Sequence, residues 1–248
     1  MWYTYIGELC MFKKIRNVKI NYKQYGKGEE VVLLHGWGQN IEMMKPLGDH
    51  LIDHYHVTII DLPGFGLSKE PVYAYDIFEY TETVHDLLKE LNIDKPIIMG
   101  HSFGGRIAIV YASKYPVNKL VLFGSPCVRH EYKSFKQSVF KAMKKVKILK
   151  PLVNVMKKHS GSEDYRNASP VMRDVLVKTV NQDLSENAKK VKCPTLLIWG
   201  DRDEAVPVSE AKELDDLLPD SALIVLPGTH YCYLENLNQV VNILYNFI

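Results

Sequence analysis

Six short apolar runs recur along the chain, each four or five residues long and bounded by polar or turn residues. They lie at residues 31–34, 57–60, 96–99, 120–123, 195–199 and 223–226. Each run is apolar at neighbouring positions rather than only at alternate ones, which is typical of strands that helices cover on both faces. Residues 18–22 instead alternate apolar and polar side chains and predict a half-buried strand.

Apolar residues between these runs recur at three- or four-residue steps, which predicts helices. Asp76 and Glu79 form a capping-box sequence at the start of one such stretch, whose apolar stripe runs to Leu91. Similar stripes cover residues 107–112 and 237–244. Strands that alternate with helices in this way predict an α/β fold with a mainly parallel sheet and helices on both faces.

The alternation breaks between residues 131 and 190, where no buried strand is predicted. Phe135 and Met143 instead belong to an apolar pattern at helical spacing. We interpret this segment as a helical cap inserted between two strands, the alternative being another part of the domain wall. The predicted division is residues 1–11 as an N-terminal extension, 12–130 and 191–248 as the core, and 131–190 as the cap.

Charge is distributed unevenly along the chain, although the formal net charge is only +2. Residues 131–190 hold 14 Lys and Arg against 6 Asp and Glu, a net of +8. The remainder holds 17 against 23, a net of −6. The small total gives no reason to expect a nucleic-acid binder.

The composition is that of a soluble globular protein, with 46% hydrophobic and 24% charged residues. No run approaches the roughly 20 apolar residues of a membrane span, so none is expected. The four cysteines have no metal-type spacing, and we expect reduced thiols in a cytoplasmic protein. No metal site is predicted.

The first candidate for chemistry is Ser102, in the sequence Gly-His-Ser-Phe-Gly at residues 100–104. This G-x-S-x-G motif follows a predicted buried strand and opens a predicted helix. A sharp turn between strand and helix projects the serine hydroxyl above the sheet edge, where it can act as a nucleophile. The helix N-terminus that follows favours the negative charge that develops during attack.

A nucleophilic serine requires a base and an acid that orients the base. His230 follows the run at 223–226, and Asp203 follows the run at 195–199. Both loops leave the carboxyl ends of predicted parallel strands, where catalytic groups collect. Asp201 is the alternative to Asp203. His101, next to the serine, is expected to be structural.

The sequence His-Gly-Trp-Gly at residues 35–38 follows another predicted strand and supplies a candidate oxyanion loop. Its glycines allow the backbone to approach a substrate closely. The N–H groups of Trp37 and Phe103 would together stabilise a tetrahedral oxyanion. Each such donor is typically worth about 3–4 kcal/mol.

The order of these motifs resembles that of the α/β-hydrolase superfamily over roughly residues 15–248. The matching sequences are HGWG at 35–38, DLPGFGLS at 61–68, GHSFGG at 100–105, GDRD at 200–203 and GTH at 228–230. The resemblance implies an eight-stranded, mostly parallel sheet with a helical cap. It also implies a triad in the order Ser102, Asp203, His230. The segment at 61–68 is expected mainly to shape a loop.

Ser102 narrows the reaction, because the dehalogenases and epoxide hydrolases of this superfamily resemble each other in carrying aspartate at that position. Serine favours a carboxylesterase-like hydrolase that cleaves a carboxylic ester or thioester through an acyl-enzyme. No cofactor or metal is implied by that chemistry. The expected substrate is a small acyl ester, with Phe135 and Met143 of the cap as candidate contacts.

The HGWG and DLPGFG sequences also resemble those of pimeloyl-carrier methyl esterases. The cap carries lysines at 141, 144, 145, 147, 150, 157 and 158. These lysines predict docking of an acidic carrier protein, and the alternative is a solvated helix face.

Two other functions fit the same scaffold. A carbon–carbon-bond hydrolase or a lyase of the menaquinone-pathway type would need cations around a substrate carboxylate, and Arg106 and Arg129 are the candidates. A non-catalytic ligand-binding homologue is the third possibility. An intact triad with an oxyanion loop argues against it.

Overall fold

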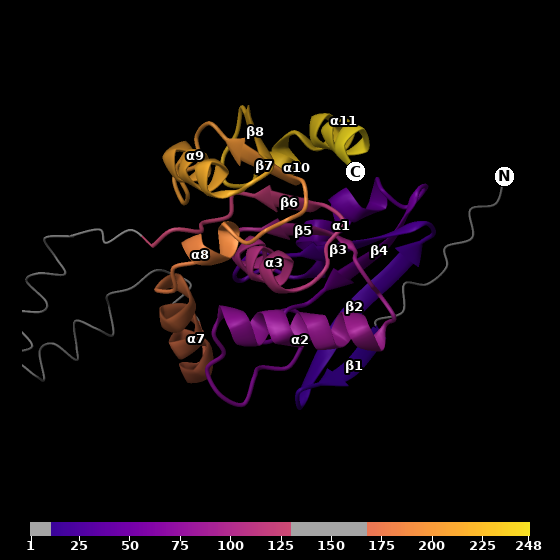
Figure 1. Ribbon diagram of the computed structural model, residues 1–248. Helices are drawn as coiled ribbons and strands as arrows, with labels where there is room; N and C mark the ends of the chain where they lie inside the picture. The colour runs from indigo at the N-terminus through magenta and orange to yellow at the C-terminus, as the bar shows by residue number, and fades with distance from the viewer. Residues whose placement is uncertain (1–10, 130–167) are drawn as a thin grey trace, which may run out of the picture.

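Eight strands form one sheet in the order β1-β2-β4-β3-β5-β6-β7-β8 (Figure 1). The computed structural model describes residues 11–129 and 168–248. The strands are β1 (Met11–Ile15), β2 (Val18–Gly26), β3 (Glu29–Leu34), β4 (Tyr55–Ile60), β5 (Ile97–His101), β6 (Leu120–Phe123), β7 (Thr195–Gly200) and β8 (Ser221–Leu226). The pairs β1–β2 and β2–β4 are antiparallel, and every pair from β4 to β8 is parallel. The predicted α/β fold with an eight-stranded, mostly parallel sheet is confirmed.

Helices cover both faces of the sheet. One face carries α1 (Ile41–Asp49), α10 (Cys232–Glu235) and α11 (Leu237–Phe247), and the other carries α2 (Ile77–Glu90), α3 (Phe103–Lys114), α7 (Pro170–Val180), α8 (Ser185–Ala188) and α9 (Val208–Leu217). Along β3, Val31 and Leu33 pack into the core under α1, α10 and α11. Val32 and Leu34 pack into the core under the helices of the other face. Successive strand residues point to opposite faces, so a strand that is covered on both faces needs apolar side chains at every position.

The predicted start of α2 is confirmed in detail. The Asp76 carboxylate accepts a hydrogen bond from the backbone N–H of Glu79, and the Glu79 carboxylate accepts one from the N–H of Asp76. This capping box satisfies two donors that a helix end leaves unpaired.

The apolar run at 223–226 behaves differently from the other five. It belongs to β8, which lies at the edge of the sheet, and Val225 is exposed. The predicted strand is present, but it is less deeply buried than the other five runs. Leu223 packs against one core of the sheet, and Ile224 and Leu226 pack against the other, but β8 has only one neighbouring strand, so Leu223 and Ile224 stay half-buried.

The segment expected to form the cap, residues 131–190, lies between β6 and β7. Of this segment the structure describes residues 168–190, which form α7 and α8. Phe135, Met143 and the seven lysines from 141 to 158 lie outside the described residues, as do residues 1–10. The division into core, cap and extension stays a prediction. No helix among residues 11–129 and 168–248 is long and apolar enough to cross a membrane.

Candidate active site

Ser102 sits at a strained turn between β5 and α3. Its φ and ψ are 50° and −110°, a left-handed conformation that non-glycine residues rarely adopt. Only glycine fits beside it: a Cβ at Gly100 would lie 2.6 Å from the Cα of Gly105, and one at Gly104 would lie 2.4 Å from the carbonyl oxygen of Leu34. The motif therefore forms the sharp strand–turn–helix geometry that presents a serine at the sheet edge.

Asp203 and His230 form a hydrogen-bonded pair. The imidazole Nδ1 donates to Asp203 Oδ2 at 2.8 Å. The other carboxylate oxygen accepts from the backbone N–H groups of Ala205 at 2.9 Å and Val206 at 2.8 Å. The carboxylate is completely buried and the imidazole is 15% exposed. With Nδ1 protonated, Nε2 is left as the basic nitrogen.

Asp201, the alternative acid, does not contact the imidazole. Its Oδ1 accepts from the backbone N–H of Gly228 at 2.8 Å, and its side chain is half exposed beside Arg202. The geometry therefore favours Asp203 as the partner of His230.

The end of β6 brings the serine turn and the acid–base pair together. The N–H of Ser102 donates to the carbonyl of Phe123 at 2.9 Å. At the next residue, Gly124, an added Cβ would lie 2.9 Å from Nδ1 of His230 and 3.2 Å from Oδ2 of Asp203. In the described residues no hydrogen bond joins the Ser102 hydroxyl to the imidazole. Such bonds often form only once substrate is bound.

His101 links the serine turn to the loop of the base. Its side chain is fully buried, and burial lowers the pKa of His101 to about 3, so that the ring is neutral. Nε2 donates to the backbone carbonyl of His230 at 3.0 Å, and Nδ1 lies 3.2 Å from Oε1 of Gln39. The structural role expected for His101 agrees with these contacts.

Two backbone N–H groups, one in the loop at 35–38 and one at the start of α3, have no partner among the described residues. The N–H groups of Trp37 and Phe103 make no hydrogen bond within residues 11–129 and 168–248. Phe103 is the first residue of α3, where backbone donors have no partner inside the helix. These are the two groups predicted to form the oxyanion hole.

The loop that holds Trp37 is fixed by a buried neutral histidine. His35 donates from Nδ1 to the carbonyl of Gly36 at 2.7 Å and accepts at Nε2 from the N–H of Leu62 at 3.0 Å. Burial lowers the pKa of His35 to about 4, which keeps Nε2 available as an acceptor. The N–H of Gly36 donates a hydrogen bond to Oε1 of Gln39 at 3.0 Å.

Asp61 organises the adjacent segment at 61–68, as the sequence predicts. Its carboxylate accepts hydrogen bonds from Nδ2 of Asn21 and from the backbone N–H groups of Ile41 and Leu67, each at 2.8 Å. A Cβ at Gly66 would lie 2.2 Å from this carboxylate. The side chain of Asp61 is thus fully used in shaping the loop.

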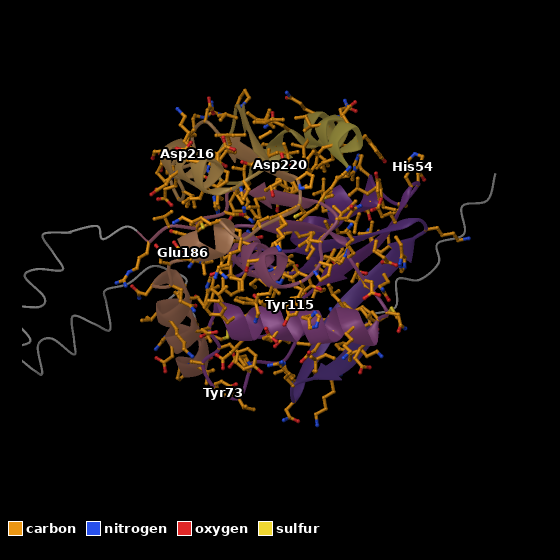
Figure 2. The ribbon with its side chains drawn as sticks, in the orientation of Figure 1. His54, Tyr73, Tyr115, Glu186, Asp216 and Asp220 are labelled. Atoms are coloured by element: carbon orange, nitrogen blue, oxygen red, sulfur yellow. The ribbon has the colours of Figure 1, made fainter. Side chains whose placement is uncertain are left out.

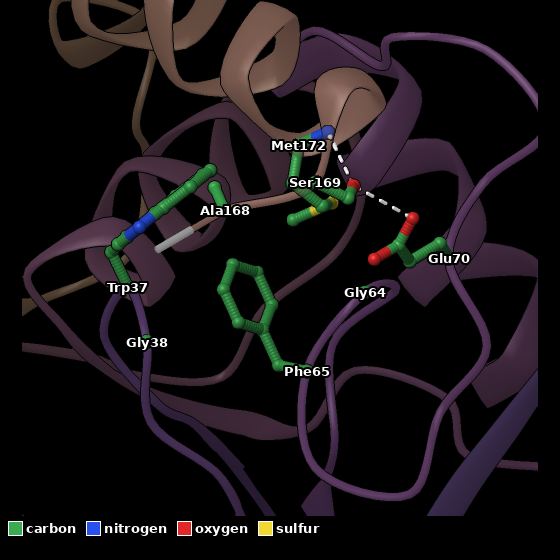
Figure 3. Close-up of a pocket in the computed structure, with 8 residues that line it drawn as sticks. All are labelled: Trp37, Gly38, Gly64, Phe65, Glu70, Ala168, Ser169 and Met172. Carbon is green, nitrogen blue, oxygen red and sulfur yellow. Dashed lines mark hydrogen bonds between the residues drawn. The ribbon is translucent and has the colours of Figure 1, made fainter. Parts of the chain in front are cut away.

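A cavity of about 320 Å³ lies beside the oxyanion loop (Figure 3). It is lined by Trp37, Gly38, Gly64, Phe65, Glu70, Ala168, Ser169 and Met172. The Trp37 ring packs edge-on against Phe65 and Phe103, with centroids 4.9 and 5.3 Å apart. Glu70 accepts from the Ser169 hydroxyl at 2.8 Å, and the same hydroxyl caps α7 by accepting from the N–H of Met172.

Sequence reasoning missed Glu70 and Met172 as residues of this cavity. The DLPGFGLS sequence offers a partial signal, because the loop that it shapes also forms one wall. The other wall comes from the start of α7, about 100 residues later, and no local pattern pairs these two segments.

The remaining predicted substrate contacts have other surroundings. Arg106 is buried in α3, and its Nη atoms donate to the carbonyls of Pro126, Thr179 and Gln182 at 3.2, 3.1 and 2.5 Å. These hydrogen bonds join α3 to the loop after β6 and to the end of α7, and they give no support to a role of Arg106 in substrate binding. The Arg129 side chain is exposed, and its backbone N–H donates to Asp183.

The described cysteines Cys127, Cys193 and Cys232 are buried free thiols. Within the described part of the chain, no group of three His, Cys, Asp or Glu side chains could hold a metal ion.

Comparison with known proteins identifies relatives of one superfamily. A family model described as alpha/beta hydrolase fold matches residues 30–149. Lipase 3 of Moraxella sp. (strain TA144) is 27% identical over 222 residues, which cover 80% of this chain and 70% of the lipase. The 2-hydroxy-6-oxo-6-(2'-aminophenyl)hexa-2,4-dienoic acid hydrolase of Metapseudomonas resinovorans is 27% identical over 260 residues, which cover 96% of this chain and 90% of that enzyme.

A pimeloyl-[acyl-carrier protein] methyl ester esterase of Proteus mirabilis (strain HI4320) is 26% identical over 246 residues, which cover 84% of this chain and 87% of the esterase. Among solved structures, the esterase EaEST from Exiguobacterium antarcticum shares the fold, with a TM-score of 0.78 at 22% identity. The match covers 96% of this chain and 99% of that one. The chain has the α/β-hydrolase fold and is similar in sequence to enzymes of the α/β-hydrolase superfamily.

Proposed function

We propose that the chain is a serine hydrolase that cleaves carboxylic esters or thioesters. Ser102 is the nucleophile, His230 the base and Asp203 the residue that orients the base. The observation that carries this proposal is the 2.8 Å hydrogen bond between His230 and Asp203, beside a strained serine turn. Lipases and esterases among the relatives support ester hydrolysis in general.

The reaction follows from the roles of these side chains. Nε2 of His230 accepts the hydroxyl proton of Ser102 as the serine oxygen attacks the ester carbonyl. The N–H groups of Trp37 and Phe103 donate to the resulting oxyanion. The imidazolium, stabilised by Asp203, then protonates the leaving alcohol or thiol. Water, activated by His230, releases the acyl group and restores the serine.

The cavity beside the oxyanion loop receives part of the substrate. Its aromatic walls suit a neutral or cationic group, and its one acidic lining residue, Glu70, disfavours a carboxylate at this position. A carbon–carbon-bond hydrolase would need cations near a substrate carboxylate. Arg106 already donates to three backbone carbonyls, so the contacts of the described residues favour the ester hydrolase.

Docking of an acidic carrier protein on the lysines from 141 to 158 forms a separate part of the proposal. A relative is named as an esterase of a carrier-bound methyl ester. Hydrolysis rates for a carrier-bound ester and a free methyl ester, compared across a salt series, test it. Equal rates that do not depend on salt would remove carrier docking but leave ester hydrolysis intact. The buried free thiols support a reducing, cytoplasmic location.

The central experiment is an activity screen on p-nitrophenyl esters of graded acyl length, with Ser102→Ala as the control. We expect turnover by the wild type and a loss of several orders of magnitude in kcat for the variant. A fluorophosphonate should label the wild type at Ser102 and leave the variant unlabelled. An inert wild type that fails to react with the probe would instead favour a non-catalytic homologue.

A further inference from the structure

A basic hollow lies at the amino ends of β5, β6 and β7, at the opposite edge of the sheet from Ser102. Two adjoining cavities of about 590 and 620 Å³ share Ser113, Lys190 and Lys192 in their walls. Their linings together contain Lys95, Lys114, Lys119, Lys189, Lys190 and Lys192, and no carboxylate. We call this set the lysine hollow. Figure 2 labels Tyr115, which lines it, and Glu186 of the neighbouring α8.

The sheet itself gathers these lysines. The N–H of Asn118 donates to the carbonyl of Pro96 at 2.9 Å, and the N–H of Leu120 donates to the carbonyl of Pro194 at 3.0 Å. The starts of the three strands are thereby held side by side. Adjacent strands are about 4.8 Å apart, so Lys95, Lys119 and Lys192 leave the backbone within about 10 Å of one another.

Three of the six ammonium groups have partners. Lys114 pairs with Glu82, Lys189 pairs with Glu186, and Lys119 donates to the carbonyl of Phe247. Lys95, Lys190 and Lys192 have no hydrogen bond or ion pair with any described residue. Only Lys114 and Lys189 are paired with a carboxylate among the described residues, so four of the six ammonium groups form no ion pair there.

Glu186, which pairs with Lys189, also interacts electrostatically with Lys190, but no carboxylate lines the hollow. Asp94 precedes Lys95 in the chain, and the backbone carbonyl of Asp220 accepts from the N–H of Thr195, but neither residue lines the hollow. Four of the six lysines lie outside residues 131–190, in the part of the chain whose formal net charge is −6. Like charges gathered there repel one another, and an anion bound between them would relieve that repulsion.

The backbone at one of these lysines is also unusual. Lys95 has φ of +42°, although it precedes a proline and carries a side chain. Both features disfavour that conformation. The turn therefore places a lysine where a neutral glycine or asparagine would be less strained, and strain of this kind concentrates at binding sites.

We propose that the lysine hollow binds a small soluble anion that carries several phosphate groups. Lysines are compact point charges suited to phosphate, and several of them favour a multivalent anion over a single phosphate. The volume lies within the range of roughly 300–1,000 Å³ typical of small-molecule sites. The five residues of β5, about 16 Å in length, separate the hollow from the serine turn, so this anion is not the substrate.

Calorimetric titration with inorganic tripolyphosphate tests the proposal at low salt, about 50 mM, where screening is modest. The variant Lys95→Gln/Lys190→Gln/Lys192→Gln removes the three charges that have no hydrogen bond or ion pair among the described residues. The matched control is Lys14→Gln/Lys27→Gln/Lys212→Gln, which removes three exposed lysines elsewhere. We expect binding by the wild type and the control, a dissociation constant at least tenfold higher for the hollow variant, and weaker binding of orthophosphate than of tripolyphosphate.

Thermal melting provides a second readout. Tripolyphosphate should raise the Tm of the wild type by a few degrees and leave that of the hollow variant nearly unchanged. Without ligand, the hollow variant should melt at or above the wild-type Tm, because repulsion has been removed. Equal loss of binding in both variants, or no binding at about 10 mM tripolyphosphate, would overturn the site. Tighter binding of duplex DNA or of acidic phospholipid vesicles through the same lysines would overturn the small-ligand assignment.

Discussion

His101 and His230 are joined by a hydrogen bond of 3.0 Å, from Nε2 of the first to the backbone carbonyl of the second. His101 immediately precedes Ser102, and His230 is the proposed base. The bond therefore fixes the separation of the two loops that must exchange a proton. Displacement of about 1 Å at such a contact can cost two orders of magnitude in rate.

Replacement of His101 should impair the chemical step more than substrate binding. His101→Phe keeps a buried ring but loses the donor to His230, and we expect kcat to fall about 10- to 100-fold with little change in KM. His101→Gln retains an N–H donor and should recover part of the loss. Steady-state kinetics of both variants, at temperatures well below their melting points, provide the test. Equal kcat values for Phe and Gln would show that the hydrogen bond is unimportant.

Stability should fall as the pH drops from about 6.5 towards 4. Burial lowers the pKa of His35 to about 4 and that of His101 to about 3, whereas both rings have ordinary values when unfolded. The unfolded chain therefore binds protons that the native state excludes, and each group contributes up to about 1.4 kcal/mol per pH unit. This contribution is fully present above pH 7 and declines below it.

Urea unfolding between pH 7 and pH 4 measures this dependence. His101→Gln removes one of the two groups and should reduce the slope by about half over the same window. A free energy of unfolding that stays flat from pH 6.5 to 4.5 would contradict the buried neutral state of both rings.

Asp203 and Asp201 form a matched pair for testing the acid. Asp203→Asn removes the carboxylate that orients His230, and we expect kcat to fall by about 10³–10⁴. Asp201→Asn, directly after the same strand, should leave kcat within about threefold of wild type because the Asp201 carboxylate interacts with Gly228 and Arg202 rather than with His230. Kinetics on one p-nitrophenyl ester compare them directly. The reverse order of effects would reassign the acid.

Glu70 should influence which esters are preferred. Its carboxylate and the aromatic rings of Trp37 and Phe65 line the cavity beside the oxyanion loop, which suits a cationic group. We expect a choline ester to be hydrolysed about three- to tenfold faster, in kcat/KM, than its neutral 3,3-dimethylbutyl isostere at low salt.

Glu70→Gln should abolish that preference while leaving kcat/KM for the neutral ester nearly unchanged. Glutamine retains an oxygen that accepts from the Ser169 hydroxyl, so the start of α7 stays capped. A preference that persists in Glu70→Gln would exclude this carboxylate as its source, without bearing on the role of Ser102.

Arg106 should matter for stability rather than for turnover. Arg106→Met leaves three backbone carbonyls without their donor, and we expect a loss of about 2–4 kcal/mol in the free energy of unfolding. The kcat/KM of the remaining folded enzyme should stay within about threefold of wild type. A fall of two orders of magnitude with unchanged stability would instead support binding of a substrate carboxylate.

Sequence reasoning succeeds here where a feature is local. The strand ends, the capping box of α2 and the glycines around Ser102 depend on neighbouring residues, and their patterns are readable in the sequence. The pairing of His230 with Asp203 rather than Asp201 was predicted by resemblance, and the geometry favours the same residue.

Features that depend on distant segments were not predictable in this way. The cavity joins residue 70 to residues 168–172, and Arg106 joins α3 to the end of α7. The lysine hollow similarly combines the starts of three strands. The exposure of β8 follows from its place at the sheet edge, which the apolar run itself does not encode.

Gly124 has a consequence for how this protein could acquire new substrates. The imidazole and carboxylate pack against bare backbone at the end of β6, so a side chain at position 124 would enter the space that they occupy. Of the described residues between Gly124 and β7, Ala168, Ser169 and Met172 line the cavity beside the oxyanion loop, whereas Asp203 and His230 lie after β7 and β8. Substrate range can therefore diverge by replacement of that one segment, while the proposed catalytic residues are retained.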